Sequence, residues 1–272
     1  MSIRLAASLL AAAGLAATAL TGATPVAAQK TTEPFRLQHL LDSRIDESSG
    51  LETAANFRET LYTHNDSGDS ARFFAVGRGG LTKALYTLRG ADFRDWEDMA
   101  AGPNKTLWFA DIGDNGRRRS AVSVYRVPEP TRLVSVNVPW TRYDFRYEDG
   151  ESYNAEALLV HPTTGVLYIA TKQKSGAAVY RAPLRLKTSG YNTLTRVSGA
   201  PPMVTGGNFS PNSKRLVLRT TELAYVYSHI GGAASVIDLP IGGESVTFWR
   251  NGADLLVGRE GSSSPVWRVP TS

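Results

Sequence analysis

Residues 155–181 read AEALLVHPTTGVLYIATKQKSGAAVYR, and this stretch decides the fold. It contains three short apolar runs, at 156–160, 166–170 and 177–181, separated by the turn sequence HPTTG and by a polar loop. Short runs rich in aromatic and β-branched residues, bounded by Gly, Pro and Ser, indicate strands. The stretch therefore predicts three strands that run up and down in sequence order.

The same arrangement occurs five times along the chain. Each copy begins with a short motif, continues 9 to 12 residues later with an apolar pair, and ends with an aromatic residue in a further strand. The five motifs are SSGL at 48–51, WEDM at 96–99, AEAL at 155–158, GGNF at 206–209 and ESV at 244–246. A period near 50 residues with constant internal spacing is the signature of a repeat protein.

The repeats predict an all-β, five-bladed β-propeller. Fourth strands are expected at 83–88, 140–147, 193–197 and 235–239, and four strands per repeat are typical of a propeller blade. The fifth copy ends at its third strand, so we expect the strand-like segment 35–41 to join the last blade and close the ring. Six blades, with extra strands from 128–149, are the main alternative. No apolar period of 3.6 is sustained after the first segment, which predicts very little helix.

The first 28 residues resemble a signal peptide. Arg4 precedes an Ala- and Leu-rich apolar stretch at 5–20, and Val26, Ala27 and Ala28 form a small-residue cleavage signal. We expect cleavage after Ala28, which leaves one secreted domain at 29–272; an uncleaved membrane anchor is the alternative. The remaining chain contains no apolar run long enough to span a bilayer.

Composition excludes several classes of function. The chain has no cysteine, which rules out disulfides and thiolate metal sites. Its formal charge of +5 falls to +4 without Arg4, and positive residues are scattered except at 117–119, which we interpret as a solvated loop. A nucleic-acid partner is therefore not expected. A small molecule or a glycan is the expected ligand, and the expected oligomeric state is a monomer.

The repeats also predict where a functional site lies. In an up-and-down blade, the first strand begins on the face where the second strand ends. The first strands begin at Glu97, Glu156 and Glu244 in three copies. The second strands end near a second set of polar residues: His64, Asn65, Asp111, Lys172, Arg219, Arg259 and Glu260. Both sets should meet at one mouth of the central channel.

Three carboxylates at a narrow mouth repel one another, so they need a cation, a shared proton or basic partners. Calcium prefers oxygen ligands, which predicts a calcium site formed by Glu97, Glu156, Glu244, Asp111 and Asn65. Zinc is disfavoured because His64 is the only nitrogen ligand at this mouth. In a catalytic site, Glu97, Glu156 and Glu244 would perform acid and base chemistry. Lys172, Arg219 and Arg259 would bind an anionic part of the substrate, with His64 and Glu260 beside them.

Other interpretations of these residues remain open. The glutamates could cap backbone amides or tie blades together, and the Asp111 segment DIGDN could be only a tight turn. Paired carboxylates also serve glycoside hydrolysis when they lie about 5 to 9.5 Å apart. The sequence has no GxSxG motif, which argues against a serine hydrolase.

Five segments carry a resemblance to a known group. They are THNDSGD at 63–69, DWEDMA at 95–100, DIGDN at 111–115, VYRVPEP at 124–130 and AEALL at 155–159. They resemble a group of secreted bacterial β-propeller proteins, which implies a propeller over nearly the whole chain but no particular reaction. The acidic mouth with basic neighbours is more distantly similar to propeller phytases and calcium-dependent propeller esterases or lactonases, whose own motifs are not matched residue by residue.

The sequence leaves two functions to be compared. One is a calcium-assisted hydrolase of an anionic or sugar-containing extracellular substrate. The other is a non-catalytic propeller that binds a ligand or partner at the cell envelope.

Overall fold

The computed structural model describes residues 33–271. The predicted signal segment and its cleavage site lie outside these residues. The described part contains 21 strands and no helix, as the repeat pattern predicted. Accordingly, within residues 33–271 no helix has the length and apolar character needed to cross a bilayer.

The strands form a β-propeller. The first sheet has the order β2-β3-β4-β5-β9 and comprises β2 (Ser48–Thr53), β3 (Thr60–Asn65), β4 (Arg72–Gly77), β5 (Thr82–Thr87) and β9 (Val136–Asn137). The closing sheet has the order β1-β21-β20-β19 and comprises β1 (Phe35–His39), β19 (Val246–Phe248), β20 (Leu255–Val257) and β21 (Pro265–Val269). Antiparallel pairing of β1 with β21 confirms that the N-terminal strand joins the sheet of the C-terminal strands.

The remaining strands form two further sheets. An eight-stranded sheet joins two meanders. The first consists of β6 (Trp96–Gly102), β7 (Thr106–Asp111), β8 (Val122–Pro128) and β10 (Thr141–Tyr147). The second consists of β11 (Ala155–Val160), β12 (Leu167–Thr171), β13 (Ala178–Arg181) and β14 (Tyr191–Gly199). The last sheet contains β15 (Gly206–Phe209), β16 (Leu216–Arg219), β17 (Leu223–Tyr227) and β18 (Ala234–Asp238). The predicted fourth strands correspond to β5, β10, β14 and β18.

One feature was not predicted from the repeat. The outer strands β10 and β14 pair in parallel, with Asp144 opposite Tyr191 and Tyr147 opposite Leu194. The pairing merges two meanders into one sheet and removes two exposed edges. The stretch 128–149 thus adds strands to existing sheets: β10 pairs with β8, and β9 pairs with β5.

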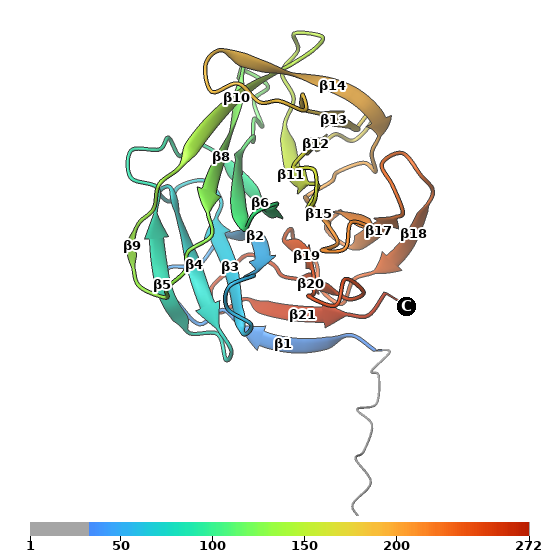
Figure 1. Ribbon diagram of the computed structural model, residues 1–272. Helices are drawn as coiled ribbons and strands as arrows, with labels where there is room; N and C mark the ends of the chain where they lie inside the picture. Colours follow the sequence, from blue (N-terminus) through green and yellow to red (C-terminus); the bar gives the residue numbers. More distant parts are fainter. Residues whose placement is uncertain (1–32, 272) are drawn as a thin grey trace, which may run out of the picture. The chain divides into compact units, whose positions relative to one another are not determined.

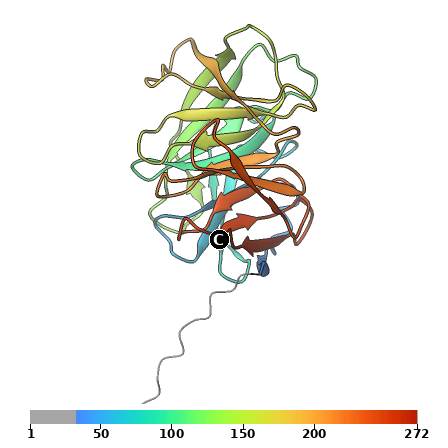
Figure 2. The same cartoon turned by 90° about the vertical axis from the view of Figure 1, so that its right-hand side faces the viewer.

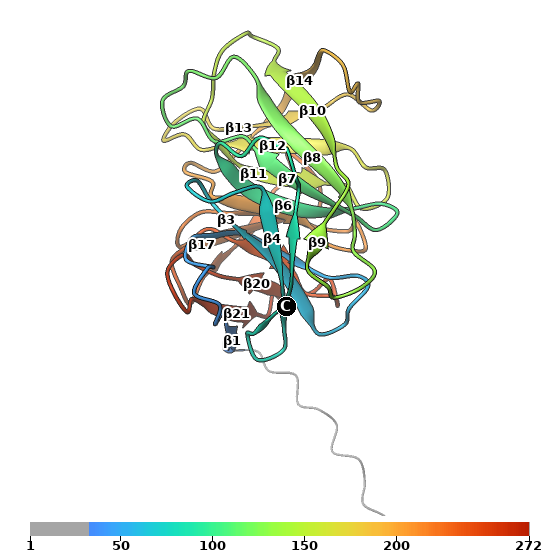
Figure 3. The same ribbon diagram turned by 90° about the vertical axis from the view of Figure 1, so that its left-hand side faces the viewer.

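The strands that begin each meander surround a central axis (Figure 1). We call β2, β6, β11, β15 and β19 the inner strands. Each packs against the next in this order, and β19 packs against β2. The two side views show the same sheets from the edge of the ring (Figures 2 and 3).

Apolar side chains fill the spaces between neighbouring sheets. The aromatic cluster between the first sheet and the β6–β8 strands includes Tyr62, Phe73, Trp96, Phe109 and Tyr125, all of which are fully buried. Aromatic side chains bury large areas and stack at specific angles, which fixes how one sheet lies on the next. A larger cluster, which includes Trp108, Tyr143 and Phe145, fills the space between the two halves of the eight-stranded sheet. Smaller apolar clusters occupy the other spaces.

Two buried acids bind the inner strands to one another. Asp98 accepts hydrogen bonds from the backbone N–H groups of Met99, Leu158 and Gly207, and so joins β6 to β11 and β15. Glu52 of β2 accepts hydrogen bonds from Thr53 N, Ala101 N, Asn208 Nδ2 and Thr247 Oγ1, and so reaches three other inner strands. We call Glu52 and Asp98 the axial acids. Each has donors on both carboxylate oxygens.

Candidate functional site

The inner strands begin where the second strands end, as predicted. Trp96 pairs with Asp111, Ala155 with Thr171, and Gly206 with Arg219. The glutamates therefore lie beside the residues that follow the second strands. Glu97 is the second residue of β6, Glu156 is the second residue of β11, and Glu244 precedes β19.

Two of the three glutamates lie in β-bulges. The register of β6 against β7 shifts between Trp96 and Asp98, and that of β11 against β12 shifts between Ala155 and Ala157. Glu97 and Glu156 are the extra residues. A bulge re-aims the side chain of its extra residue and is common beside active sites. In β6 the shift also leaves Asp98, the next residue, to bind the neighbouring inner strands.

The three predicted glutamates converge on one mouth of the channel, which we call the acidic mouth. The ammonium group of Lys172 lies 2.6 Å from Glu156 Oε1 and 3.8 Å from Glu244 Oε1. Asp66 lies between Glu244 and Glu97, because it offers a carboxylate oxygen within 4.8 Å of a carboxylate oxygen of each.

Two groups of carboxylates in this mouth have the size of a cation site. One contains Asp66, Asp95 and Glu97, and the other contains Asp66, Glu244 and Glu260; within each group the ligand oxygens lie within 4.8 Å of one another. Calcium–oxygen distances are about 2.3 to 2.6 Å, so oxygens on opposite sides of one ion lie about 5 Å apart. One ion could therefore contact all three members of either group.

Glu156 has a carboxylate oxygen without a partner. Its Oε1 atom accepts a hydrogen bond of 3.3 Å from Asn154 Nδ2 in addition to the Lys172 contact, but its Oε2 atom is buried and has no partner. The side chain is only 4% exposed. A buried unpaired carboxylate oxygen is costly, so its position needs an explanation in terms of a proton, a water or a bound ligand.

Burial and mutual repulsion raise the pKa values of these acids. Burial raises the pKa of Glu97 far above its ordinary range, with Glu156 and Asp66 adding to the effect. Burial also raises the pKa of Glu156, although Lys172 opposes this. The pKa of Asp66 rises to about 6, and that of Glu260 rises to about 7, in both cases mainly through burial. The mouth therefore holds protons at neutral pH that a cation would displace.

Gly113 leaves room for the carboxylates. A Cβ atom at this position would lie 2.0 Å from Glu97 Oε1 and 2.4 Å from Asp95 Oδ2. The backbone N–H of Gly113 donates a hydrogen bond of 3.2 Å to the carbonyl oxygen of Asp95. The DIGDN segment is thus more than a tight turn, since its glycine fits against two members of one carboxylate group.

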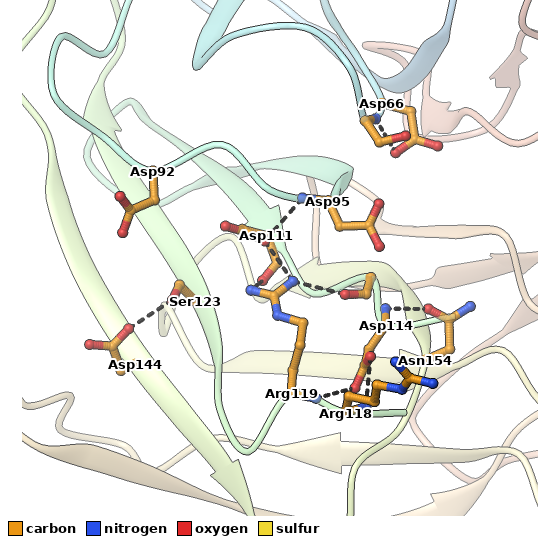
Figure 4. A network of polar contacts seen from close by, with 12 residues as sticks. Asp66, Asp92, Asp95, Asp111, Asp114, Arg118, Arg119, Ser123, Asp144 and Asn154 are labelled. Carbon is orange, nitrogen blue, oxygen red and sulfur yellow. Dashed lines mark hydrogen bonds and ion pairs between the residues drawn. The ribbon is translucent and has the colours of Figure 1, made fainter. Parts of the chain in front are cut away.

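The rest of that segment forms a support behind the mouth (Figure 4). Arg119 makes an ion pair of 2.7 Å with Asp111, and the two side chains are 7% and 3% exposed. Asp114 accepts hydrogen bonds from the backbone N–H groups of Arg118 and Arg119 and donates its own N–H to Asn154 Oδ1. The interpretation of residues 117–119 as a solvated loop is therefore wrong for Arg119, whose charge is buried against Asp111.

The two other predicted metal ligands lie outside the carboxylate groups. Asp111 is paired with Arg119, as described above. Asn65 donates hydrogen bonds to the carbonyl oxygen of Arg44 at 2.7 Å and to Asp69 Oδ2 at 3.0 Å, while its Oδ1 atom accepts one from Glu47 N. These contacts occupy the amide group of Asn65 in holding the neighbouring loop.

His64 and Arg219 are fully buried. The His64 ring packs edge-on against Trp96 and Phe109, and burial lowers its pKa to about 4, so it is neutral at pH 7. The Arg219 guanidinium donates hydrogen bonds to the carbonyl oxygens of Ser245, Gly258 and Ile241, and so binds β16 to the loops around β19 and β20. Arg259 and Glu260 follow β20 and are exposed as whole residues, but the Glu260 carboxylate lies against Asp66 and Glu244 and is partly shielded from solvent there.

A basic hollow adjoins the acidic mouth at Lys172. It has a volume of about 350 Å³, and its lining includes Arg117, Lys172 and Lys174 together with the amides of Asn115 and Asn154. No carboxylate lines it. The hollow is therefore suited to an anionic group held next to the Glu156 carboxylate.

Neither Asp66 nor Asp95 was assigned a role as a ligand from the sequence. Asp66 directly follows His64 and Asn65, at the exit of a second strand that was expected to reach this mouth. Asp95 lies one residue before β6, outside the repeat position that carries the glutamates. Both occur in segments that carry the family resemblance, THNDSGD and DWEDMA.

Comparisons with known proteins concern the fold. The sequence matches no protein-family model and no curated protein sequence. Among solved structures, a gluconolactonase from Xanthomonas campestris is similar over 87% of this chain and 88% of its own, with a TM-score of 0.54 and 15% sequence identity. A structural-genomics target with a provisional gluconolactonase name gives a TM-score of 0.46 at 14% identity, covering 88% of this chain and 91% of its own. The Dos1 propeller gives 0.41 at 13% identity, covering 78% and 52%. The first likeness supports the propeller fold, and we draw nothing from the other two.

Proposed function

We propose that this protein is a secreted, calcium-assisted hydrolase whose reaction takes place at the acidic mouth. The observation that carries the proposal is the buried, unpartnered Oε2 atom of Glu156 beside two cation-sized groups of carboxylates. A purely structural acid would have its oxygens satisfied, as those of the axial acids are. We further propose that the ring has five blades, which the cyclic packing of the inner strands supports.

The residues of the mouth fit calcium. All members of the two groups offer carboxylate oxygens, which suit a hard cation such as calcium. Asp66, Asp95 and Glu97 would hold the ion, and the space that Gly113 leaves open accommodates two of these carboxylates. A bound calcium ion would stabilise negative charge that develops on a substrate oxygen.

Glu156 is the proposed general base. Its raised pKa lies closer to neutral pH than that of an ordinary glutamate, as catalysis by proton transfer requires. In the hydrolysis of an ester or lactone, Oε2 would take a proton from the attacking water while the water oxygen bonds to the carbonyl carbon. The bond from this carbon to the leaving oxygen then breaks, and Glu156 returns the proton to that oxygen. Lys172 holds the Oε1 atom in place throughout.

The basic hollow defines the substrate class. Arg117, Lys172 and Lys174 would bind a carboxylate, phosphate or similar anionic group of a small molecule or glycan. Of the basic side chains predicted to bind an anion, Lys172 lines the hollow and keeps this role. Arg259 is exposed at the rim of the mouth, where an anionic substrate can also reach it. Arg219 has its donors engaged with backbone carbonyls, so we assign it a structural role instead. Because the gluconolactonase shares the fold, acidic sugar lactones are the first substrates to test.

The test combines calcium binding with turnover. We expect millimolar calcium to raise the melting temperature relative to chelator, because a ligand bound only by the folded state stabilises it. We also expect hydrolysis of at least one compound in a panel of sugar lactones, phosphate esters and cell-wall glycans. Glu156→Gln should lower kcat by about 10² to 10⁴-fold, the usual contribution of a general base.

Glu151→Gln is the matched control, because Glu151 is exposed and its carboxylate makes no hydrogen bond or ion pair among residues 33–271. Full activity of Glu156→Gln, with calcium still required, would remove Glu156 as the base. Ligand binding without any turnover in the unmodified protein would instead favour a non-catalytic binding propeller. We propose that either activity belongs to a secreted monomer with no nucleic-acid partner.

A further inference from the structure

A large groove lies where the closing sheet meets the first sheet. Its volume is about 830 Å³. The lining comes from β1, from the loop between β2 and β3, and from the turn between β19 and β20, and it includes Leu37, Gln38, Arg58, Leu61, Trp249 and Arg250. We call it the seam groove. Loops that join first to second strands lie at the opposite end of each hairpin from the acidic mouth, so the groove is a separate site.

The groove carries an excess of positive charge. Three arginines line it, Arg58, Arg78 and Arg250, against one acid, Glu59. Glu59 pairs with Arg78 at 3.3 Å, and both of these side chains are well exposed. Within residues 33–271, neither Arg58 nor Arg250 makes an ion pair. Two guanidinium groups therefore line the groove without an ion-pair partner among residues 33–271.

Two buried donors on its wall have no acceptor. Gln38 accepts a hydrogen bond from Gly79 N at its Oε1 atom, at 3.2 Å, which leaves its Nε2 group buried and unpartnered. Arg250 donates from Nη2 to the carbonyl oxygen of Phe57 at 2.7 Å, while its Nε group is buried without a partner. Unpaired buried donors are costly, and an acceptor placed in the groove would satisfy them.

The nearest acids do not fill this role. Glu129 Oε1 accepts hydrogen bonds from Asn56 N at 3.0 Å and Tyr62 Oη at 3.4 Å. Glu52 is occupied by its contacts along the axis. These two acids therefore do not supply acceptors to the unpaired donors. Trp249, Leu37 and Leu61 add apolar surface to the same groove.

We propose that the seam groove binds a small organic anion. A carboxylate or phosphate would accept hydrogen bonds from Arg58, Arg250 and Gln38, and an aromatic or aliphatic body would pack against Trp249 and Leu37. Charge-assisted hydrogen bonds to guanidinium groups are among the strongest polar contacts in proteins, which explains the preference for an anion. The site is independent of the chemistry at the acidic mouth.

Isothermal titration calorimetry on the purified protein tests the proposal. The probes are benzoate, phenyl phosphate and the neutral benzyl alcohol. We expect saturable binding of at least one anion with a dissociation constant of about 1 mM or lower. Comparison of the two anions shows whether the groove prefers a carboxylate or a phosphate. Arg58→Glu should weaken binding about tenfold or more, because it reverses an exposed charge at the site.

Arg185→Glu is the control, because Arg185 is also exposed but lies in the loop after β13. Lys174→Glu should bind the anion normally, since Lys174 lines the basic hollow and not the seam groove. Four results would overturn the proposal. They are no saturable binding by about 10 mM, which corresponds to very weak affinity; equal affinity for benzyl alcohol; equal losses in the two arginine variants; and loss of binding in Lys174→Glu, which would place the anion in the basic hollow.

Discussion

Two sets of buried acids lie on the inner strands, and they differ in how far the chain supplies hydrogen-bond donors to their carboxylates. The axial acids, Glu52 and Asp98, accept hydrogen bonds on both carboxylate oxygens from neighbouring strands. At the acidic mouth, Glu156 retains a buried oxygen with no partner, and Glu97 lies in a bulge among other carboxylates. Both sets are costly to bury. Only the first recovers this cost fully from the chain itself, because Lys172 and Asn154 contact just one oxygen of Glu156. This difference supports our proposal that the second set binds a ligand.

The contrast is sharpest at adjacent residues. Glu97 and Asp98 follow one another in β6, yet the bulge turns one toward the mouth and leaves the other to join three inner strands. Both pKa values are raised by burial. A raised pKa alone therefore does not distinguish the two acids; they differ in whether the chain supplies hydrogen-bond donors to the carboxylate.

The largest effect is expected from Asp98→Ala. The substitution leaves three buried backbone N–H groups without an acceptor, at about 1 to 3 kcal/mol each, so we expect a loss of roughly 3 to 9 kcal/mol in the free energy of unfolding. Chemical denaturation monitored by circular dichroism measures it. A loss below 1 kcal/mol would show that the axial acids do not hold the ring, which would remove one side of the comparison.

Glu97→Gln should have the opposite profile. Removing one carboxylate from a repelling group should leave the stability in chelator unchanged or raise it. It should also abolish the stabilisation by calcium, which would reach about 2.7 kcal/mol at a hundredfold excess over the dissociation constant. Thermal unfolding with calcium and with chelator separates the two effects. If calcium stabilised this variant as strongly as the unmodified protein, Glu97 would not be a ligand.

Gly113→Ala should produce a partial loss of the calcium response. The added Cβ would meet Glu97 Oε1 and Asp95 Oδ2, and so displace two carboxylates while leaving their number unchanged. We expect calcium affinity to fall about tenfold, on the order of 1.4 kcal/mol, by titration calorimetry. Gly116→Ala is the matched control, because the nearest atom to its Cβ would lie 3.6 Å away. Equal affinities in both variants would contradict the role of Gly113.

The smallest effect concerns pH. The folded protein holds protons on Asp66, with a pKa of about 6, and on Glu260, with a pKa of about 7, more tightly than the unfolded chain does. The stabilisation that these protons provide is complete below the ordinary carboxyl pKa and is lost as the pH rises through these values. In chelator we therefore expect the melting temperature to fall by a few degrees between pH 5 and 8. Calcium should reverse the trend, which scanning fluorimetry can follow. A fall of equal size with calcium present would contradict a cation in the mouth.

The sequence predicted much of the fold because the fold repeats. Five copies of one strand pattern located the inner strands and the N-terminal strand that joins β21. The parallel pairing of β10 with β14 could not be predicted in the same way, because it joins the outer edges of two copies and appears in neither copy alone.

The candidate site was predicted in part. Glu97, Glu156, Glu244 and Lys172 do meet at one mouth, since their place in the repeat determines their place on the ring. The burial of Arg219 was not foreseen, because a cation at a strand end usually points to solvent; here three backbone carbonyls surround it. The bulges that re-aim Glu97 and Glu156 leave no clear sequence signal either, since they insert one residue without a glycine or proline.

The pairing of β1 with β21 makes closure of the ring depend on two segments that lie far apart in the sequence. A contact between distant segments must overcome a large loop-closure entropy, so such contacts form slowly. A chain that lacked Pro265–Val269 would leave β1 without its partner and would expose strand edges to other chains. We therefore expect closure of the ring to be a slow step of folding, and the open form to be prone to aggregation until that step is complete.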